Sequence, residues 1–499
     1  MFRPLRRLLF GMTRNEPAPR RHERAVPRRV VRARYDAAQH SDNSRRHWAM
    51  ADGLSARAAN SAEVRRVLRN RSRYEVANNS YAKGIVLTLA NDVVGTGPRL
   101  QMMGLSGVDN HRIEREFATW ARAIGLADKL RTLRIARTQD GESFGILTDN
   151  PVLPTRVTLD LRLVEAEQVT TPNPGAVHEE RGVDGLRFDR WGNVVEYHVL
   201  RKHPGGRLLH IGGDFDRLPA AAMIHDFRSE RPGQARGIPE ITPALPLFAM
   251  LRDYSLATLD AAKAAAYFAG ILYTDAPANG EAEDVVPMDA IELERNMLMT
   301  MPGGWKLGQV KAEHPSASYA EFKREVLNEI ARCLNMPFNI AAGNSSGYNY
   351  ASGRLDHQIY FKAIRVDQAH IESVILDRIF AAWVREAVLI EGYLPQRLRL
   401  TSTDWSHQWF WDGNEHVDPA KEANAQATRL ANHTTTLADE YAKRGQDWET
   451  QLHQRAKERK LMDELRLSAG DLRPAGRDPN APNSKENANE KQEAHADAS

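Results

Sequence analysis

The sequence lacks the cysteine pairs typical of secreted proteins and the long apolar runs of membrane-spanning proteins. It contains one cysteine, Cys333, among 499 residues, which excludes an intrachain disulfide framework and a cysteine-based zinc cluster. No apolar run approaches the ~18 residues that a membrane span needs, and the apolar stretch in "MFRPLRRLLFGM" is too short for a signal peptide. The sequence therefore predicts a soluble protein made in a reducing cytoplasm, with Cys333 as a buried, inert thiol in a helix.

Motifs for nucleotides, metals and cofactors are also missing. The Gly-Thr-Gly at 95–97 lacks the rest of a dinucleotide fingerprint, and no lysine follows a glycine-rich stretch as in a phosphate-binding loop. The histidines are scattered and form no His-Glu-x-x-His pair. Asp160, Glu165 and Glu167 are expected on the solvated face of a strand. We therefore expect no metal ion, no cofactor and no catalytic residue.

One pentapeptide nevertheless argues for catalysis. Residues 141–145 read "GESFG", the Gly-x-Ser-x-Gly pattern of a hydrolase nucleophile elbow, with Ser143 as the nucleophile. An elbow needs a strand before the serine and a helix after it, but here a helical pattern precedes and a strand-like pattern follows. The Gly-Gly pair in "HIGGD" at 210–214 also comes after the serine, where it does not fit an oxyanion hole. We interpret the pentapeptide as a helix-to-strand turn, and a serine hydrolase at Ser143 stays as an alternative.

Positive charge is concentrated at the N-terminus. Residues 1–35 hold eleven arginines, including Arg20, Arg21, Arg28 and Arg29, against two glutamates, which gives this basic arm a net charge of +9. Because the whole chain carries +3, the remaining residues carry −6. Such arms are typically disordered and contact polyanions. A second alternative is a monomeric DNA-processing enzyme that holds its substrate with the arm, although the acidic metal cluster it would need is not evident in the sequence.

Apolar periodicity predicts helices first and a β-rich layer after them. Residues 62–92 show helical spacing, since Val64, Val67 and Leu68 recur at intervals of three and four, and a second helical stretch runs from 110 to about 137. Residues 144–226 include segments in which apolar and polar side chains alternate with period two, which is typical of half-buried strands.

Long helices dominate the rest of the chain. Thr242 is a suitable N-cap, Pro243 fits the first turn, and Gly270 fits the end of a helix that would be roughly 40 Å long. A mixed segment, a second helix and a polar loop are expected in order at 271–315, 316–336 and 337–353. Another helix is expected from about Arg354 to Leu389, within a segment of helix and strand that ends at 416, and residues 417–470 are expected to be helical. The last 29 residues, 471–499, have almost no large apolar side chains and are expected to be disordered.

Six segments, taken in order, resemble the portal proteins of tailed bacteriophages of the lambda-type family. The most specific of them is "RPGQARGIPEITPAL" at 231–245. The other five are "NNSYAKGIVLTLANDVVGTGPRLQ" (78–101), "QDGESFG" (139–145), "LRLVEAEQV" (161–169), "NIAAGNSSGYNYASGR" (339–354) and the pair "VDPAKEANA" and "TTTLADEYAKRGQDWE" (417–449). The resemblance covers roughly residues 30–470 and favours a structural protein over an enzyme.

The resemblance implies an α+β fold of portal type, with a β-containing wing and clip, long stem helices and a helical C-terminal crown. The implied parts are the arm (1–35), the wing (36–241), stem helix 1 (242–270), the clip (271–315), stem helix 2 (316–336), the channel loop (337–353), the wing return (354–416), the crown (417–470) and the tail (471–499).

The resemblance also implies a function. Subunits of this family form rings, usually of twelve copies, around a DNA channel at one capsid vertex of the virion, after assembly in the host cytoplasm. The implied partners are double-stranded DNA bound without sequence preference, a terminase ATPase as the external motor, neck or head-completion proteins, and the major capsid or scaffold protein; no membrane is implied.

Three sets of residues are expected at these contacts. Short polar side chains that form exchangeable hydrogen bonds suit a channel through which DNA slides, whereas clustered lysines would act as a brake. The expected channel residues are Asn344, Ser345, Ser346, Tyr348, Asn349 and Arg354. On the clip, Lys306 and Lys311 are expected to face the motor. In the arm, Arg20, Arg21, Arg28 and Arg29 are expected to contact packaged DNA or the acidic surface of a shell or scaffold protein.

Overall fold

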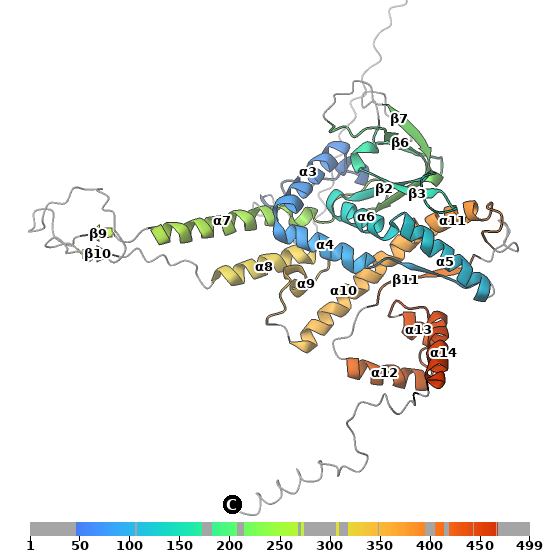
Figure 1. Ribbon diagram of the computed structural model, residues 1–499. Helices are drawn as coiled ribbons and strands as arrows, with labels where there is room; N and C mark the ends of the chain where they lie inside the picture. Colours follow the sequence, from blue (N-terminus) through green and yellow to red (C-terminus); the bar gives the residue numbers. More distant parts are fainter. Residues whose placement is uncertain are drawn as a thin grey trace, which may run out of the picture. The chain divides into compact units, whose positions relative to one another are not determined.

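The computed structural model describes most of the chain between residues 46 and 467 (Figure 1). The described residues are 46–104, 107–171, 182–206, 214–267, 271–273, 306–308, 318–347, 349–394, 405–413, 419–442, 444–465 and 467. Contacts divide the chain into two units, Met1–Ser55 and Ala56–Ser499, and every element named below belongs to the second. The expected arm (1–35) and tail (471–499) lie outside the described residues. Within the described part, no helix is both long and apolar enough to cross a bilayer.

Helices form the first part of the second unit. They are α2 (Ala56–Ala59), α3 (Ala62–Asn78), α4 (Ser80–Val94), α5 (Gly107–Ala123) and α6 (Leu126–Asp140). The stretch 62–92, expected as one helical region, is two helices because Asn79 adopts an extended conformation, and its side chain accepts hydrogen bonds from the N–H groups of Tyr81 and Ala82. Gly125, at φ 64°, separates α5 from α6 in a left-handed conformation that favours glycine.

The strands of this region form small antiparallel sheets. They pair as β1 (Arg99–Met102) with β11 (His407–Phe410), as β3 (Leu159–Val164), β2 (Glu142–Asp149) and β8 (Met223–Phe227), and as β4 (Gly182–Val183), β5 (Leu186–Phe188), β6 (Val194–Leu200) and β7 (Phe215–Pro219). In the three-stranded sheet β2 is central, and Phe144 lies opposite Val164 of β3 and His225 of β8. Short 3-10 turns at Ala166–Gln168 and Ala220–Ala222 lie beside this sheet. The β-rich layer expected at 144–226 is therefore present.

Two helices flank a small two-stranded sheet in the next part. The order is a 3-10 turn (Thr242–Ala244), α7 (Leu245–Tyr267), β9 (Ile271–Tyr273), β10 (Lys306–Gly308) and α8 (Ser318–Arg332). β9 pairs antiparallel with β10. α7 and α8 lie side by side (Figure 1), and the rings of Tyr254 and Tyr319 stack with their centroids 5.7 Å apart. Thr242 is not the N-cap that we expected, because it lies inside the 3-10 turn and its hydroxyl donates to the Pro239 carbonyl at 2.6 Å.

Helices also occupy part of the segment expected as a polar loop. α9 (Phe338–Ala342) begins after Pro337 and ends at Gly343, whose φ is 62°. α10 (Tyr350–Ile371) begins four residues before Arg354. It continues through a π-helical turn (Glu372–Leu376) into α11 (Asp377–Ala387).

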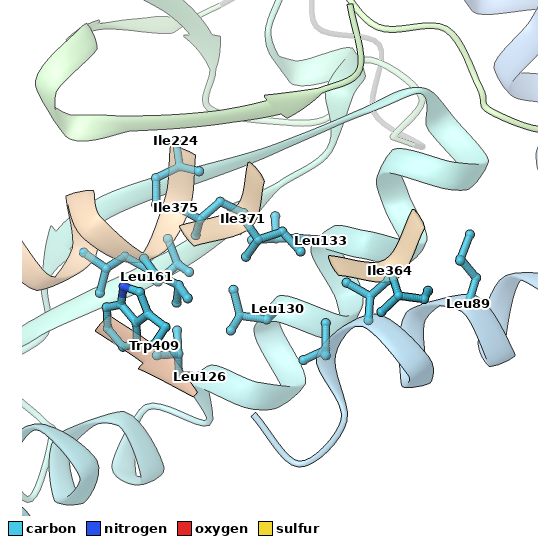
Figure 2. Close-up of a cluster of buried hydrophobic side chains, with 14 of the residues drawn as sticks. Leu89, Leu126, Leu130, Leu133, Leu161, Ile224, Ile364, Ile371, Ile375 and Trp409 are labelled. Carbon is cyan, nitrogen blue, oxygen red and sulfur yellow. The ribbon is translucent and has the colours of Figure 1, made fainter. Parts of the chain in front are cut away.

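A hydrophobic core joins these helices to the sheets. On α5, Ile113, Phe117 and Trp120 are buried in this core. The ring of Phe117 lies 5.4 Å from that of Trp383 and 5.7 Å from that of Trp409, measured between centroids. Burying each such side chain contributes about 1.5–3 kcal/mol. Figure 2 shows more of this cluster, with labelled side chains Leu89, Leu126, Leu130, Leu133, Leu161, Ile224, Ile364, Ile371, Ile375 and Trp409.

The C-terminal part is helical, as expected. It contains α12 (Pro419–Ala431), α13 (Leu437–Ala442) and α14 (Trp448–Glu464). Gly445, at φ 66°, lies in the turn between α13 and α14, and the side chain of Asp447 accepts from the N–H of Thr450 at 3.0 Å and caps α14. Gln101 of β1 donates to Asp447 at 2.6 Å, which ties this helix to the β1–β11 sheet.

Candidate functional site

A first ion cluster surrounds Glu142 at the start of β2. The Glu142 side chain is fully buried and accepts from Arg236, with Nε 2.8 Å from Oε2 and Nη2 2.7 Å from Oε1. It also accepts from the N–H of Gly237 at 3.0 Å and from Arg69 at 3.2 Å. Burial by itself would raise the pKa of Glu142, but the charge of Arg236 holds this pKa well below its usual range. The cluster balances four arginines with four carboxylates: Arg65, Arg69, Arg73, Arg236, Asp140, Glu142, Glu167 and Asp184.

A second ion cluster is centred on Glu240. Arg134 and Arg137 of α6 donate to the two oxygens of Glu240 at 2.9 and 3.1 Å, and both arginines also contact Asp367 of α10, at 2.7 and 3.0 Å. Asp226 of β8 lies 3.4 Å from Arg137. Burial opposes ionisation of Glu240, but the two arginines lower its pKa to about 2. The cluster therefore joins α6, β8, α10 and the segment before α7 through charges that compensate one another.

Two glycines bring the two clusters together. Gly141 ends α6 at φ 91°. A Cβ atom at Gly237 would lie 2.0 Å from the carbonyl oxygen of Gly141, and a Cβ at Gly141 would lie 2.4 Å from the carbonyl carbon of Ile238. Because backbone meets backbone at this point, neither position has room for a side chain.

Ser143 does not lie in a nucleophile elbow. Helix α6 precedes it and strand β2 contains it, which is the reverse of the strand–turn–helix order that an elbow requires. Ser143 is 2% exposed, and among the described residues its Oγ has no hydrogen-bond partner that could act as a base. The pentapeptide instead supplies Gly141 for the close contact and Glu142 for the first ion cluster.

One group of side chains has the composition of a metal site. Ligand atoms of Glu165, Glu167 and His203 lie within 4.8 Å of one another. However, Arg73 lies 2.9 Å from Glu167 and 3.5 Å from Glu165, and Arg69 lies 3.3 Å from Glu167. The expected position of Glu167 on a solvated strand face is therefore wrong, because its carboxylate is partly buried and already neutralised by guanidinium groups.

The expected channel residues share one segment, and two of them shape its backbone. The Oδ1 atom of Asn344 accepts from the N–H of Ser346 at 2.9 Å and from its hydroxyl at 2.6 Å. Asn349 accepts from the N–H of Ser352 at 2.8 Å and so caps α10. Both asparagine carbonyl oxygens are thus engaged within the segment.

The remaining expected contact residues are only partly described. Ser345 and Arg354 are exposed, as is Lys306 on β10. Tyr348 and Lys311 lie outside the described residues, and so do four arginines of the arm: Arg20, Arg21, Arg28 and Arg29.

The Cys333 side chain is partly buried, and its thiol is expected to be unreactive. Its Sγ donates to the carbonyl of Ile330 at 3.1 Å, and burial raises the pKa of the thiol to about 11. The thiol is therefore protonated near neutral pH, as expected of an inert cysteine.

The sequence reasoning missed the arginines of α3. On this helix Val64 is 40% exposed, whereas Arg65 and Arg69 are buried. Arg65, Arg69 and Arg73 follow one another at a spacing of four, which places them on one helix face. That spacing predicts an arginine face on the helix, but it does not reveal the carboxylates that pair with these arginines.

Comparisons with known proteins cover most of the chain. A family model described as phage portal protein, lambda family, matches residues 42–368. The probable portal protein of Halomonas phage phiHAP-1 is 26% identical over 472 residues, covering 88% of each chain. The portal protein of Escherichia phage N15 is 21% identical, covering 77% of this chain and 82% of its own. Portal protein B of Escherichia phage lambda is 21% identical, covering 60% of this chain and 61% of its own.

The chain is also similar to a chain in a solved structure of a gene transfer agent (GTA) particle. A chain from the neck of a native GTA particle, computed with C12 symmetry, aligns with a TM-score of 0.45 and 14% sequence identity. The alignment covers 77% of this chain and 94% of the other.

Proposed function

Because the chain belongs to the lambda family of phage portal proteins, we propose that it forms a ring-shaped DNA channel at one vertex of a capsid. An external ATPase motor packages the genome through this channel, and the DNA later leaves by the same route. The family match over residues 42–368 is the observation that carries the proposal. The ring is proposed to hold twelve copies.

The order of elements supports an assignment of parts. α7 is stem helix 1, the β9–β10 sheet belongs to the clip, and α8 is stem helix 2. Residues 36–241 and 354–416 form the wing, and α12, α13 and α14 form the crown.

Imaging the purified protein by negative-stain electron microscopy, with native mass spectrometry to count subunits, tests the ring. Rings with a central hole and a mass near twelve subunits are expected. The proposal would be refuted by a protein that stays monomeric over a wide range of salt and protein concentrations, and also in the presence of a scaffold or capsid protein.

We further propose that the segment 337–353 faces DNA in the channel. Ser345 and the exposed Arg354 offer a hydroxyl and a cation to phosphate oxygens, whereas Asn344 and Asn349 hold the backbone in place through the hydrogen bonds described above. Contacts of this kind carry no sequence information, which suits a channel. Deleting 344–349 is expected to reduce the amount of DNA packaged, while rings still form. Unchanged packaging would contradict the role.

Two further contacts complete the proposal. Lys306 and Lys311 face the terminase motor and later the neck proteins, so reversing both charges should weaken motor binding. The arm contacts packaged DNA or the acidic surface of a capsid or scaffold protein, so removing residues 1–35 should abolish a salt-dependent association. In each experiment the unaltered ring is the control.

A further inference from the structure

Helix α10 carries an exposed apolar stripe. Leu355, Ile359 and Val366 are 63%, 60% and 64% exposed. Their spacings of four and seven residues place them on one face of the helix. Single exposed apolar residues are common on protein surfaces, but a row along one face is typical of a surface that contacts another molecule.

A groove runs beside this stripe. It has a volume of about 390 Å³, and its lining includes Ile359, Lys362 and Val366 of α10, together with Leu89, Leu334 and Arg134. Arg134 is only 3% exposed, and among the described residues its Nε has no hydrogen-bond acceptor. A buried donor without an acceptor is unfavourable, so an acceptor brought by an occupant of the groove would stabilise it.

Charge decides which surface can cover the stripe. Arg354, Lys362 and Arg365 are exposed on α10 close to the apolar residues. Two copies that met stripe to stripe would bring these cations against one another, which opposes a symmetric contact. The occupant is therefore expected to be apolar and acidic.

α7 has the required composition. Met250 and Leu256 are 67% and 54% exposed, and Asp253 and Asp260 are exposed at the intervening helical spacings. Asp260 pairs with Lys263 at 3.2 Å, which leaves Asp253 as the carboxylate best suited to meet a cation from outside. On the opposite side of the helix, Leu251 is buried in the core.

We propose that the α7 face of one copy, formed by Met250, Asp253 and Leu256, packs on the α10 face of the next copy, formed by Ile359, Lys362 and Val366. The contact joins two different surfaces, so it is heterologous, and such contacts produce a closed ring when the rotation between copies closes. The inference rests on the proposed function, since it names the subunit contact from which the ring is built.

Charge reversal tests the pairing directly. Lys362→Glu and Asp253→Lys are each expected to raise the protein concentration needed for half assembly by roughly tenfold or more, because each places like charges in contact. The double variant, which restores opposite charges at every contact, is expected to assemble nearly as the unaltered protein does. Ile359→Glu is expected to abolish assembly, whereas Val152→Glu, at an 87% exposed position between β2 and β3 and outside both helices, is the matched control. Native mass spectrometry and sedimentation velocity measure assembly, and circular dichroism checks that each variant is folded.

Covalent capture gives a second, independent measurement. A chain with both Leu256→Cys and Ile359→Cys is expected to give a ladder of covalent oligomers with a short bismaleimide, while a chain with one of the two changes is not. Cys333 contributes little, because its thiol is protonated near neutral pH.

Each outcome has a defined meaning. Rings from the unaltered protein together with normal assembly of Ile359→Glu and Lys362→Glu would overturn the inference and leave the proposed function in place. Loss of assembly in both single charge variants without rescue in the double variant would refute the pairing of α10 with α7. An unaltered protein that forms no ring under any condition would overturn both proposals.

Discussion

Replacing Glu142 by glutamine is expected to remove a large part of the stability of the fold. The carboxylate accepts hydrogen bonds at both oxygens: Arg236 and Gly237 donate to Oε2, and Arg236 and Arg69 donate to Oε1. Glutamine has one acceptor oxygen, so its NH₂ group would face donors on one side, and the buried charge of Arg236 would lose its main partner. Removing one member of a buried ion pair typically costs about 3–5 kcal/mol, and we expect the free energy of unfolding to fall by that amount.

Urea unfolding followed by tryptophan fluorescence, at protein concentrations below those needed for assembly, measures this loss. Glu165→Gln is the matched control, because the Glu165 side chain is 58% exposed and lies 3.5 Å from Arg73; its loss is expected to stay within ~1 kcal/mol. Combining Glu142→Gln with Arg236→Gln should cost less than the sum of the two single changes, since the uncompensated charge is then gone. A Glu142→Gln variant within about 1 kcal/mol of the unaltered protein would refute the reasoning.

Three further predictions address single groups. The pKa of Glu240 is lowered from 4.5 to about 2. Its contribution of about 3 kcal/mol to the free energy of unfolding is therefore present above pH ~4.5 and is lost as the pH falls toward 2. Urea midpoints measured at stepwise lower pH should show this loss in the unaltered protein, and the Glu240→Gln variant should not show it. Gly237→Ala puts a Cβ 2.0 Å from the Gly141 carbonyl oxygen and should fail to give stable protein. Gly84→Ala, in open space on α4, should gain about 0.5–1 kcal/mol in thermal or urea unfolding, and equal stability of the two variants would contradict this. Because the pKa of the Cys333 thiol is raised from 9.0 to about 11, its reaction with a disulfide reagent at pH ~8 should be about tenfold or more slower in the folded than in the unfolded chain; equal rates would contradict the burial of this thiol.

The helices and strands could largely be predicted from the sequence, because their apolar periodicity is local. The break at Asn79 was missed because helical spacing continues on both sides of it, and only the cap geometry interrupts the helix. The ion clusters could not be predicted, since Arg69 and Glu142 are 73 residues apart and Arg236 and Glu142 are 94 apart. Partners at such separations are brought together only by the tertiary fold.

The resemblance identified the family, which the family model confirms over residues 42–368, but it did not explain the quoted segments. "QDGESFG" and "RPGQARGIPEITPAL" are far apart in sequence, yet the structure packs Gly141 of one against Gly237 of the other and pairs Glu142 with Arg236. This mutual packing cannot be seen in either segment alone. In the expected channel segment, Asn344 was predicted to form exchangeable hydrogen bonds with DNA, but the sequence does not reveal that its side-chain carbonyl oxygen already accepts from Ser346.

The π turn at Glu372–Leu376 constrains how many codons encode this stretch of helix, in addition to which residues they encode. A π turn holds about one residue more than an α turn, which rotates the following residues by roughly 100° relative to an uninterrupted helix. Upstream of it, Ile364 and Ile371 face the core, and downstream Phe380 and Trp383 do. Deleting one codon within the turn would restore a regular helix and swing the two downstream rings out of the core. Insertions and deletions in these five codons should therefore be purged by selection even where substitutions are tolerated.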